Sequence, residues 1–290
     1  MTYDLAIGDR AYSSWSLRGW LLFHRFGIPV RTQRATLYSD ELPALLAKFP
    51  PARQVPVIRT PDGSVIWDTV AIAEELSQRH PEASLWPKNP ELRGAARALT
   101  AEMHSGFGAL RAACPMNLRV AYSDFVPSDA VLADLDRIEH LWAFARRMSP
   151  EGPWLFGKYS VADAFYAPVA ARIAGYGLPV GAAAGAYVMK HLSDPAFRRW
   201  RAMGQVDGPD QAAYAMENAT TVWPGPAVRT AAVAEGPSEN SACPYSGDPV
   251  THFLETEGRV FGFCNAFCRD KTLEDPDAWP EFTALLERTC

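Results

Sequence analysis

The cysteines are the residues whose type and spacing most directly indicate chemistry in this sequence. Of the five, only Cys114 precedes residue 241. Cys243, Cys264 and Cys268 follow the pattern Cys-x20-Cys-x3-Cys, so the last two thiols are one helical turn apart. Several cysteines in a short segment of a cytosolic protein favour a metal ion over disulfide bonds. The tail therefore predicts a thiolate metal site, with zinc as the expected ion.

A second group is a run of serines at an expected turn between a strand and a helix. Residues 3–7 have the pattern of a strand, and Ser13 and Ser14 stand where the next helix would be capped. Ser16 and Arg18 follow within the first turn. From the residues alone, the role of these hydroxyls is to cap the helix.

The first eighty residues alternate strand and helix patterns in the order β-α-β-α-β-β-α. The expected elements are strands at residues 3–7, 30–35, 55–58 and 65–67 and helices from about residue 13, over 40–48 and over 69–79. Helical patterns with Pro-rich breaks follow, and the apolar segment 161–174 predicts a buried central helix with a bend at Pro168. Ser160 and Asp163 have the spacing of a capping box at its start.

These patterns and the composition divide the chain into four parts. They are an α/β domain, an all-α domain, a linker and a small C-terminal domain, at residues 1–82, 88–218, 219–240 and 241–290. The tail is too short to bury a large core, so we expect a bound metal ion to stabilise its fold.

The charge balance narrows the partners. The chain has 33 Asp and Glu against 28 Lys and Arg, a net charge of −5, which favours neither nucleic acid nor anionic lipid. With 48% hydrophobic residues and no uninterrupted apolar stretch near 18 residues, we expect a globular protein without a membrane span. We expect a cytoplasmic location.

This arrangement resembles the glutathione transferase superfamily over about residues 1–215. The resemblance rests on the serine run, on Gln54-Val55-Pro56, on Asp68-Thr69 and on the capping box. It implies a thioredoxin-like domain followed by a helical domain, glutathione as the cosubstrate and a homodimer. Residues 12–20 and 103–119 are also similar to a large group of bacterial transferase-like proteins.

The serine run is most similar to the zeta class, whose maleylacetoacetate isomerases have a cysteine where this chain has Trp15. A free thiol has a pKa near 8.5, so an enzyme must stabilise the thiolate of glutathione. A donated hydrogen bond and a helix N-terminus do so. The resemblance assigns this catalytic role to Ser13, five residues before Arg18, with Ser14 and Ser16 as alternatives.

The resemblance also supplies a glutathione-binding set. Val55 would pair its backbone with the cysteinyl part, and its bond to Pro56 would be cis. Asp68 would accept from the γ-glutamyl ammonium, and Thr69 would bind the α-carboxylate. The glycyl end would contact Gln54 and Arg53, although an exposed Arg53 could equally be solvated.

Residues for the second substrate are less defined. Met103, Phe107, Met116 and Asn117 of the helical domain are candidates, but such spacing is more often core. Cys114 is not at the turn where cysteine-type enzymes of the superfamily carry their thiol.

The tail, residues 241–282, resembles the TRASH and YHS metal-binding domains, which implies a zinc-knuckle or treble-clef-like fold. Cys290 is the first candidate for a fourth ligand and His252 the second. The alternative is that the cysteines are buried small hydrophobes.

Three functions follow from these resemblances. The first is a transferase that adds glutathione to an electrophilic small molecule, with Ser13 activating the thiol. The second is a glutathione-dependent cis-trans isomerase. The third is a transferase fold that binds partners or carries metal without turnover.

Overall fold

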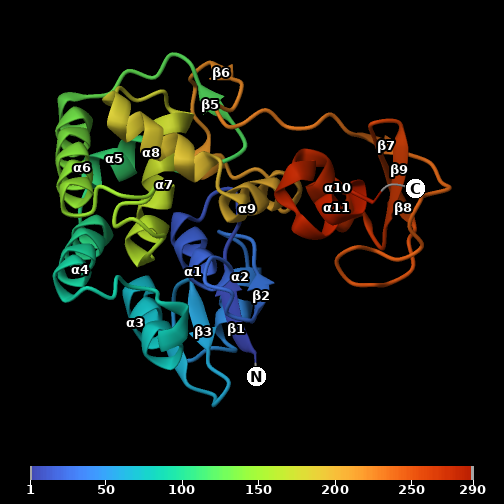
Figure 1. The fold of residues 1–290 in the computed structure, drawn as a ribbon, viewed down its shortest axis with the longest axis horizontal. Coiled ribbons are helices and arrows are strands. Elements are labelled where there is room, and N and C mark those ends of the chain that lie inside the picture. The colour runs from blue at the N-terminus through green and yellow to red at the C-terminus, as the bar shows by residue number, and fades with distance from the viewer. Residues whose placement is uncertain (1, 289–290) are drawn as a thin grey trace. The chain divides into compact units, whose positions relative to one another are not determined.

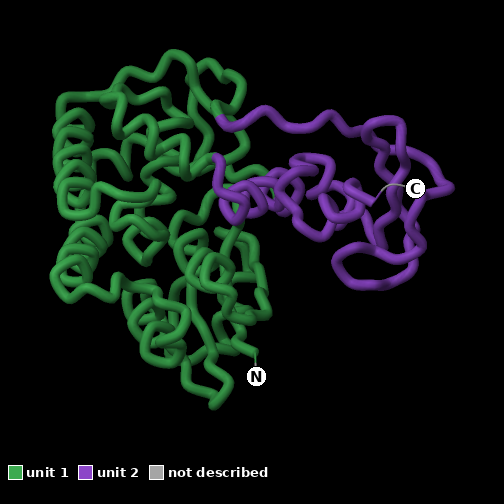
Figure 2. Tube along the Cα trace, in the orientation of Figure 1, with its two compact units in different colours: residues 1–192, 209–224 green, residues 193–208, 225–290 purple. Residues whose placement is uncertain are grey.

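The computed structural model describes residues 2–288 and divides the chain into two compact units (Figure 2). The first comprises residues 1–192 and 209–224, and the second comprises residues 193–208 and 225–290. No helix among residues 2–288 is both long and apolar enough to span a membrane.

The first unit begins with a four-stranded sheet in the order β2-β1-β3-β4 (Figure 1). The strands are β1 (Tyr3–Ile7), β2 (Val30–Arg34), β3 (Val57–Arg59) and β4 (Val65–Trp67). β1 is parallel to β2 and antiparallel to β3, and β3 is antiparallel to β4. The helices are α1 (Ser14–His24), α2 (Glu41–Leu46) and α3 (Thr69–Arg79). The predicted β-α-β-α-β-β-α order is confirmed.

Both faces of this sheet are buried. Successive side chains of a strand point to opposite faces, so Leu5 and Ile7 lie on one face and Ala6 on the other, all three with no exposed surface. Ala6 packs with Val57 and with Leu45 of α2. α1 packs on α3, which contacts β3 and β4. Packing on the sheet and on each other therefore fixes the positions of α1 and α3.

Helices make up most of the rest of the first unit. They are α4 (Pro90–Ser105), α5 (Gly108–Ala113), α6 (Asp129–Met148), α7 (Val161–Gly175) and α8 (Ala182–Leu192). α7 contacts α1, α4 and α8, and every residue in it except Ala174 is buried. The predicted central helix is confirmed, and it continues through Pro168.

The capping box that starts α7 is also confirmed. Asp163 Oδ2 accepts hydrogen bonds from the Ser160 backbone N–H at 2.8 Å and from the Ser160 hydroxyl at 3.0 Å. Asp163 Oδ1 accepts from the Leu155 N–H at 3.1 Å and from the Tyr187 hydroxyl at 2.8 Å. One buried carboxylate thus ties three segments of the helical region together.

We expect Asp163→Ala to lower the free energy of unfolding by about 3 kcal/mol or more, because it leaves several buried donors without an acceptor. Asp136→Ala removes an exposed carboxylate from α6 and should change stability by no more than about 0.5 kcal/mol. Urea denaturation measures both variants. Equal stability of Asp163→Ala and the parent would show that this network contributes nothing.

The predicted linker, residues 219–240, carries two short strands, one in each unit. β6 (Thr220–Thr221) pairs with β5 (Ala121–Tyr122) in the first unit. β7 (Ala232–Ala234) pairs with β8 (His252–Thr256) in the second. Backbone pairing of so few residues needs no apolar periodicity, which is why the sequence pattern indicated only a linker.

In its described part, the second unit contains a three-stranded antiparallel sheet, β7-β8-β9, and three α-helices. Its remaining elements are β9 (Arg259–Phe263), α9 (Pro195–Val206), α10 (Ala266–Glu274) and α11 (Pro280–Leu286). Short 3-10 helices occur at Pro81–Ala83 and Ala212–Tyr214 in the first unit and at Pro276–Ala278 in the second. The core of this sheet includes Leu254, Phe261, Phe263 and Phe282, none with exposed surface.

Helix α9 lies within the predicted all-helical domain 88–218, but it belongs to the second unit because it packs on α10. Arg198 of α9 donates two hydrogen bonds to Asp275, at 2.8 and 2.6 Å. The two residues of this bidentate pair are 77 positions apart, so no local sequence pattern predicts their contact.

Candidate functional site

A cavity of about 890 Å³ lies in the first unit and is lined by its α/β and helical parts together. Eight of the nine residues predicted to activate or bind glutathione line it: Ser13, Ser14, Arg53, Gln54, Val55, Pro56, Asp68 and Thr69. A volume of this size is typical of a small-molecule site. The N-termini of α1 and α3 both reach this cavity, through Ser13 and Ser14 and through Asp68 and Thr69.

Ser13 is the N-cap of α1. Its Oγ accepts a hydrogen bond from the Ser16 N–H at 3.2 Å and lies 2.7 Å from Ser16 Oγ, to which it donates. Ser16 Oγ also accepts from the Gly8 N–H at 3.0 Å. Hydroxyl hydrogens rotate, so Ser16 can equally donate to Ser13 and leave the Ser13 hydrogen for a group in the cavity.

The other two serines are placed differently. Ser14 is the first residue of α1 and lines the cavity, and its hydroxyl bonds to none of the described residues. Ser16 is completely buried and does not line the cavity. Of the three predicted hydroxyls, the structure therefore brings two to the cavity and holds the third beneath it.

The Val55–Pro56 peptide bond is cis, as predicted. Pro56 packs directly on α1, because a Cβ added to Gly19 would lie 2.8 Å from Pro56 Cγ. Gln54 and Arg53 are exposed at the cavity. The segment 53–56 thus brings to the cavity the backbone that precedes β3 and the two exposed polar side chains of Arg53 and Gln54.

Asp68 combines an unusual backbone with two polar contacts. Its φ of 72° lies in the left-handed region, which residues other than glycine seldom adopt. Residues with such strained backbone angles are concentrated at functional sites. Oδ1 accepts from the Val70 N–H at 2.8 Å, which caps α3, and Oδ2 lies 3.2 Å from His104 Nε2. Burial, opposed by Asp68, lowers the pKa of His104. The lowered pKa favours the neutral form of His104.

Thr69 follows Asp68 as the first residue of α3. It has no exposed surface, and its buried Oγ1 has no hydrogen-bond partner among the described residues. Thr69 nevertheless lines the cavity. A buried hydroxyl costs free energy when it is unpaired, so this one is suited to a bound polar group.

Sequence reasoning missed several residues that line the same cavity: Tyr12, Trp15, Trp67, Arg111, Arg172 and Tyr214. Of the residues it named for a second substrate, Met116 lines the cavity, whereas Met103, Phe107 and Asn117 do not. Cys114 is completely buried, and burial raises the pKa of its thiol to about 12, so it remains protonated. No periodicity marks the missed residues, because tertiary packing alone brings them together.

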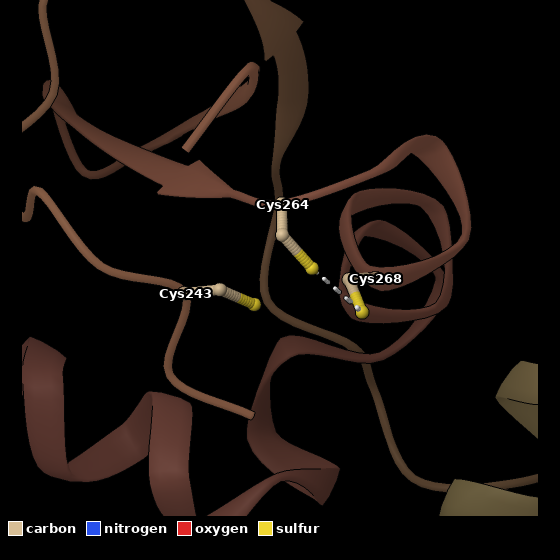
Figure 3. A group of neighbouring side chains, drawn as sticks. All are labelled: Cys243, Cys264 and Cys268. Carbon is tan, nitrogen blue, oxygen red and sulfur yellow. Dashed lines mark hydrogen bonds between the residues drawn. The ribbon is translucent and has the colours of Figure 1, made fainter. Parts of the chain in front are cut away.

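In the second unit, the three predicted cysteines lie together (Figure 3). The sulfur atoms of Cys243, Cys264 and Cys268 are all within 4.8 Å of one another. Cys264 follows β9, Cys268 lies on α10 and Cys243 comes from a turn. Asn265 caps α10 by accepting from the Cys268 N–H at 2.8 Å, which aligns two of the thiols.

The thiol geometry fits a metal ion. Two sulfurs bound at 2.3 Å in tetrahedral geometry lie about 3.8 Å apart, and those of Cys264 and Cys268 are 3.9 Å apart. Burial acts to raise the pKa of Cys243, but backbone N–H groups, that of Cys264 first, lower it to about 7. Burial raises the pKa of Cys268 to about 12 although the ammonium of Lys271, over the rings of Tyr245 and Trp279 at 3.8 and 4.0 Å, acts to lower it, so binding of a metal ion there has to displace the thiol proton.

The predicted fourth ligand is not found among the described residues. His252 is not part of the thiol group, since its Nδ1 lies 2.9 Å from Thr251 Oγ1 at the start of β8. Cys290 lies outside the described residues.

Comparisons with known proteins agree with this geometry. Residues 12–79 match the family described as "Glutathione S-transferase, N-terminal domain". A stretch of 97 residues, one third of this chain, is 35% identical to a probable maleylacetoacetate isomerase of Caenorhabditis elegans. The chain spans 44% of the length of that relative.

Solved structures share the fold. A glutathione transferase homolog from Burkholderia gl BGR1, solved with bound glutathione, is 20% identical with a TM-score of 0.54 and aligns over 71% of this chain and 99% of its own. Glutathione transferase Omega 2S from Trametes versicolor is 21% identical with a TM-score of 0.53, over 69% and 93%. Residues 12–79 of this chain therefore match a glutathione S-transferase N-terminal domain, and the first unit shares the fold of these solved glutathione transferases.

Proposed function

We propose that the first unit binds glutathione and activates its thiol for addition to an electrophilic small molecule. The observation that carries the proposal is the single cavity that gathers the serine run, the cis-proline segment and the Asp68–Thr69 pair. Two helix N-termini border it, and partial positive charge there stabilises both a thiolate and a carboxylate. The glutathione-bound structure of the same fold supports this assignment.

In this mechanism the cysteinyl sulfur lies at the N-terminus of α1. The Ser13 hydroxyl, which donates to Ser16 Oγ at 2.7 Å, turns its hydrogen to the thiolate, and Ser16 then donates to Ser13 and orients it. Asp68 accepts from the γ-glutamyl ammonium, and Thr69 donates to the neighbouring carboxylate. Val55 pairs its backbone with the cysteinyl residue, and Gln54 and Arg53 contact the glycyl end.

Two measurements test this function. Calorimetry measures glutathione binding, and the absorbance change with 1-chloro-2,4-dinitrobenzene measures conjugation. Binding with turnover supports a transferase, and binding without turnover supports a binding protein. Absence of binding at millimolar glutathione would contradict the proposal.

The runner-up function is glutathione-dependent cis-trans isomerisation, which the relative from Caenorhabditis elegans favours. The thiolate would add to a double bond, a single bond would rotate, and the thiolate would leave. Glutathione is then regenerated, whereas conjugation consumes it. Measuring free thiol during turnover separates the two reactions.

We expect Asp68→Asn to weaken glutathione binding about ten- to a hundredfold, because an amide meets the ligand ammonium without a negative charge. Asparagine caps helices as well as aspartate, so α3 should stay intact. Asp40→Asn is the matched control, since Asp40 precedes α2, is exposed and does not line the cavity. Equal Kd values for Asp68→Asn and the parent would assign the γ-glutamyl group to other residues.

We also propose that Cys243, Cys264 and Cys268 bind one metal ion, with zinc as the expected ion. The sulfur distances support it, and three thiolates form a soft donor set that zinc accepts. Such a metal would link a turn, a strand end and a helix. Its role would be structural, and its test is given in the Discussion.

A further inference from the structure

Three arginines lie close together beside the cavity of the first unit. Arg111 and Arg172 line it, and Arg18 is completely buried next to Trp15. The guanidinium carbons of Arg18 and Arg111 lie 4.3 and 4.9 Å from the centre of the same Trp15 ring. The three come from α1, α5 and α7, so only the fold brings them together.

None of these three guanidinium groups is paired with a carboxylate among the described residues. Arg172 donates to the carbonyl oxygens of Cys114 at 2.8 Å and Pro168 at 3.3 Å, and Arg111 donates to that of His104 at 3.2 Å. The three side-chain nitrogens of Arg18 have no hydrogen-bond partner among those residues, and its guanidinium lies over the rings of Trp15 and Phe165.

Arg119 shows the contrast, because its guanidinium pairs with Asp210 at 2.6 Å. The acid that lines the cavity, Asp68, is held by the Val70 N–H and by His104. The three arginines therefore form a cluster of positive charge in which Arg18 is attracted by Asp68, but in which no guanidinium is bonded to a carboxylate of the described residues.

Burying several positive charges together costs free energy unless an anion binds between them. Burial, together with repulsion from Arg111, lowers the pKa of Arg172 to about 10. Burial, followed by repulsion from Arg172 and Arg111, lowers the pKa of Arg18 well below its usual value. Unpaired buried charges cost several kcal/mol. A carboxylate in the cavity would offset this cost and can accept two parallel bonds from a guanidinium.

We propose that Arg111 and Arg172 form an anion-binding subsite for the second substrate, which is an electrophile carrying a carboxylate group. The subsite adjoins apolar and aromatic surface from Tyr12, Tyr214 and Met116, which suits an aromatic or unsaturated body. Arg18 adds positive potential from behind Trp15. This assignment rests on the proposed glutathione-dependent function.

A matched pair of electrophiles tests the subsite: 4-chloro-3-nitrobenzoate and its methyl ester. In each, the thiolate sulfur forms a bond to the ring carbon that bears chlorine, the carbon–chlorine bond breaks and chloride leaves. The thiol proton goes to water. The two compounds differ in the negative charge that the arginines would bind. The ester ring is intrinsically more reactive, so the change in the ratio of their kcat/KM values between variants, in which intrinsic reactivity cancels, is the quantity that tests the subsite.

We expect the enzyme to prefer the benzoate over its ester, and Arg111→Gln to reduce the ratio of their kcat/KM values about ten- to a hundredfold. Arg172→Lys should also reduce it, because a lysine keeps the charge but not the paired geometry. Arg147→Gln is the control, since it removes an exposed arginine of α6 outside the cavity lining. Circular dichroism verifies that each variant is folded.

If neither electrophile reacts, the subsite is tested by calorimetry, which measures the Kd of the unreactive probe 3-nitrobenzoate. Weaker binding of this probe to Arg111→Gln than to Arg147→Gln supports the subsite even then. Equal binding of the probe to both variants would overturn it. A loss confined to glutathione affinity would also overturn it, since the arginines would then serve the carboxylates of the tripeptide. Absence of glutathione binding by the parent contradicts the proposed function separately.

Discussion

Ser13→Ala is expected to lower the rate of conjugation about ten- to a hundredfold while leaving the Kd of glutathione nearly unchanged. The hydroxyl would act on the thiolate, which forms only when the thiol ionises, and not on the peptide as a whole. One charge-assisted hydrogen bond contributes about 1.5–3 kcal/mol, which corresponds to that range of rates. Stopped-flow kinetics and calorimetry measure the two quantities separately.

The pH profile identifies the mechanism behind such a loss. If Ser13 stabilises the thiolate, the apparent pKa of bound glutathione should lie below the value near 8.5 of a free thiol, and Ser13→Ala should raise it. The thiolate fraction at neutral pH then falls, so the variant should recover part of its rate as pH rises. A variant with a low rate and an unchanged profile would place the defect elsewhere.

Two further variants distinguish the catalytic effect of the Ser13 hydroxyl from its effect as a helix cap. Ser13→Thr keeps a hydroxyl and should retain much of the activity. Ser128→Ala removes the N-cap of α6, which accepts from the Val131 N–H, and controls for loss of a cap of about 1 kcal/mol.

The remaining serines decide the assignment. Ser14→Ala should have little effect, although its hydroxyl is free of partners among the described residues. Full activity of Ser13→Ala together with inactive Ser14→Ala would assign catalysis to Ser14 instead. Ser16→Ala should give an intermediate loss, because Ser16 orients the Ser13 hydroxyl without touching glutathione.

Local signals in the sequence were sufficient for the framework of the first unit. The alternation at residues 3–7, the prolines and glycines at turns and the Ser160–Asp163 spacing each depend on a few consecutive residues. They located the sheet, the central helix and the two helix N-termini at the cavity. The cis bond at Pro56 followed from the resemblance and is present.

Features that depend on packing between distant residues could not be predicted this way. Arg111 and Arg172 are 61 positions apart, and nothing local distinguishes them from solvated arginines. The assignment of α9 to the second unit depends on its pairing with Asp275, far along the chain. His252, a candidate ligand on the basis of its residue type and its place in the tail, is not a member of the thiol group.

Removal of a bound metal is expected to unfold much of the second unit and to spare the first. A structural zinc site in a small domain contributes about 10 kcal/mol or more, comparable with the whole stability of a typical domain. Purified protein prepared without chelators should contain about one zinc per chain. After chelation, hydrogen exchange should accelerate in β8, β9 and α10, and also in α9, because α9 packs on α10. Protection in β1 and α7 should remain.

Cys264→Ser is the corresponding variant, and Cys114→Ala is its matched control, since Cys114 is a buried thiol of the first unit. Cys264→Ser should lose the metal and the protection of the second unit, whereas Cys114→Ala should keep both. The competing account is that the apolar core around Leu254, Phe261 and Phe263 holds the unit together without metal. A second unit that is metal-free and fully protected in the parent would support that account and contradict the zinc assignment. Because the residues proposed to bind glutathione all belong to the first unit, we expect Cys264→Ser to bind glutathione as the parent does.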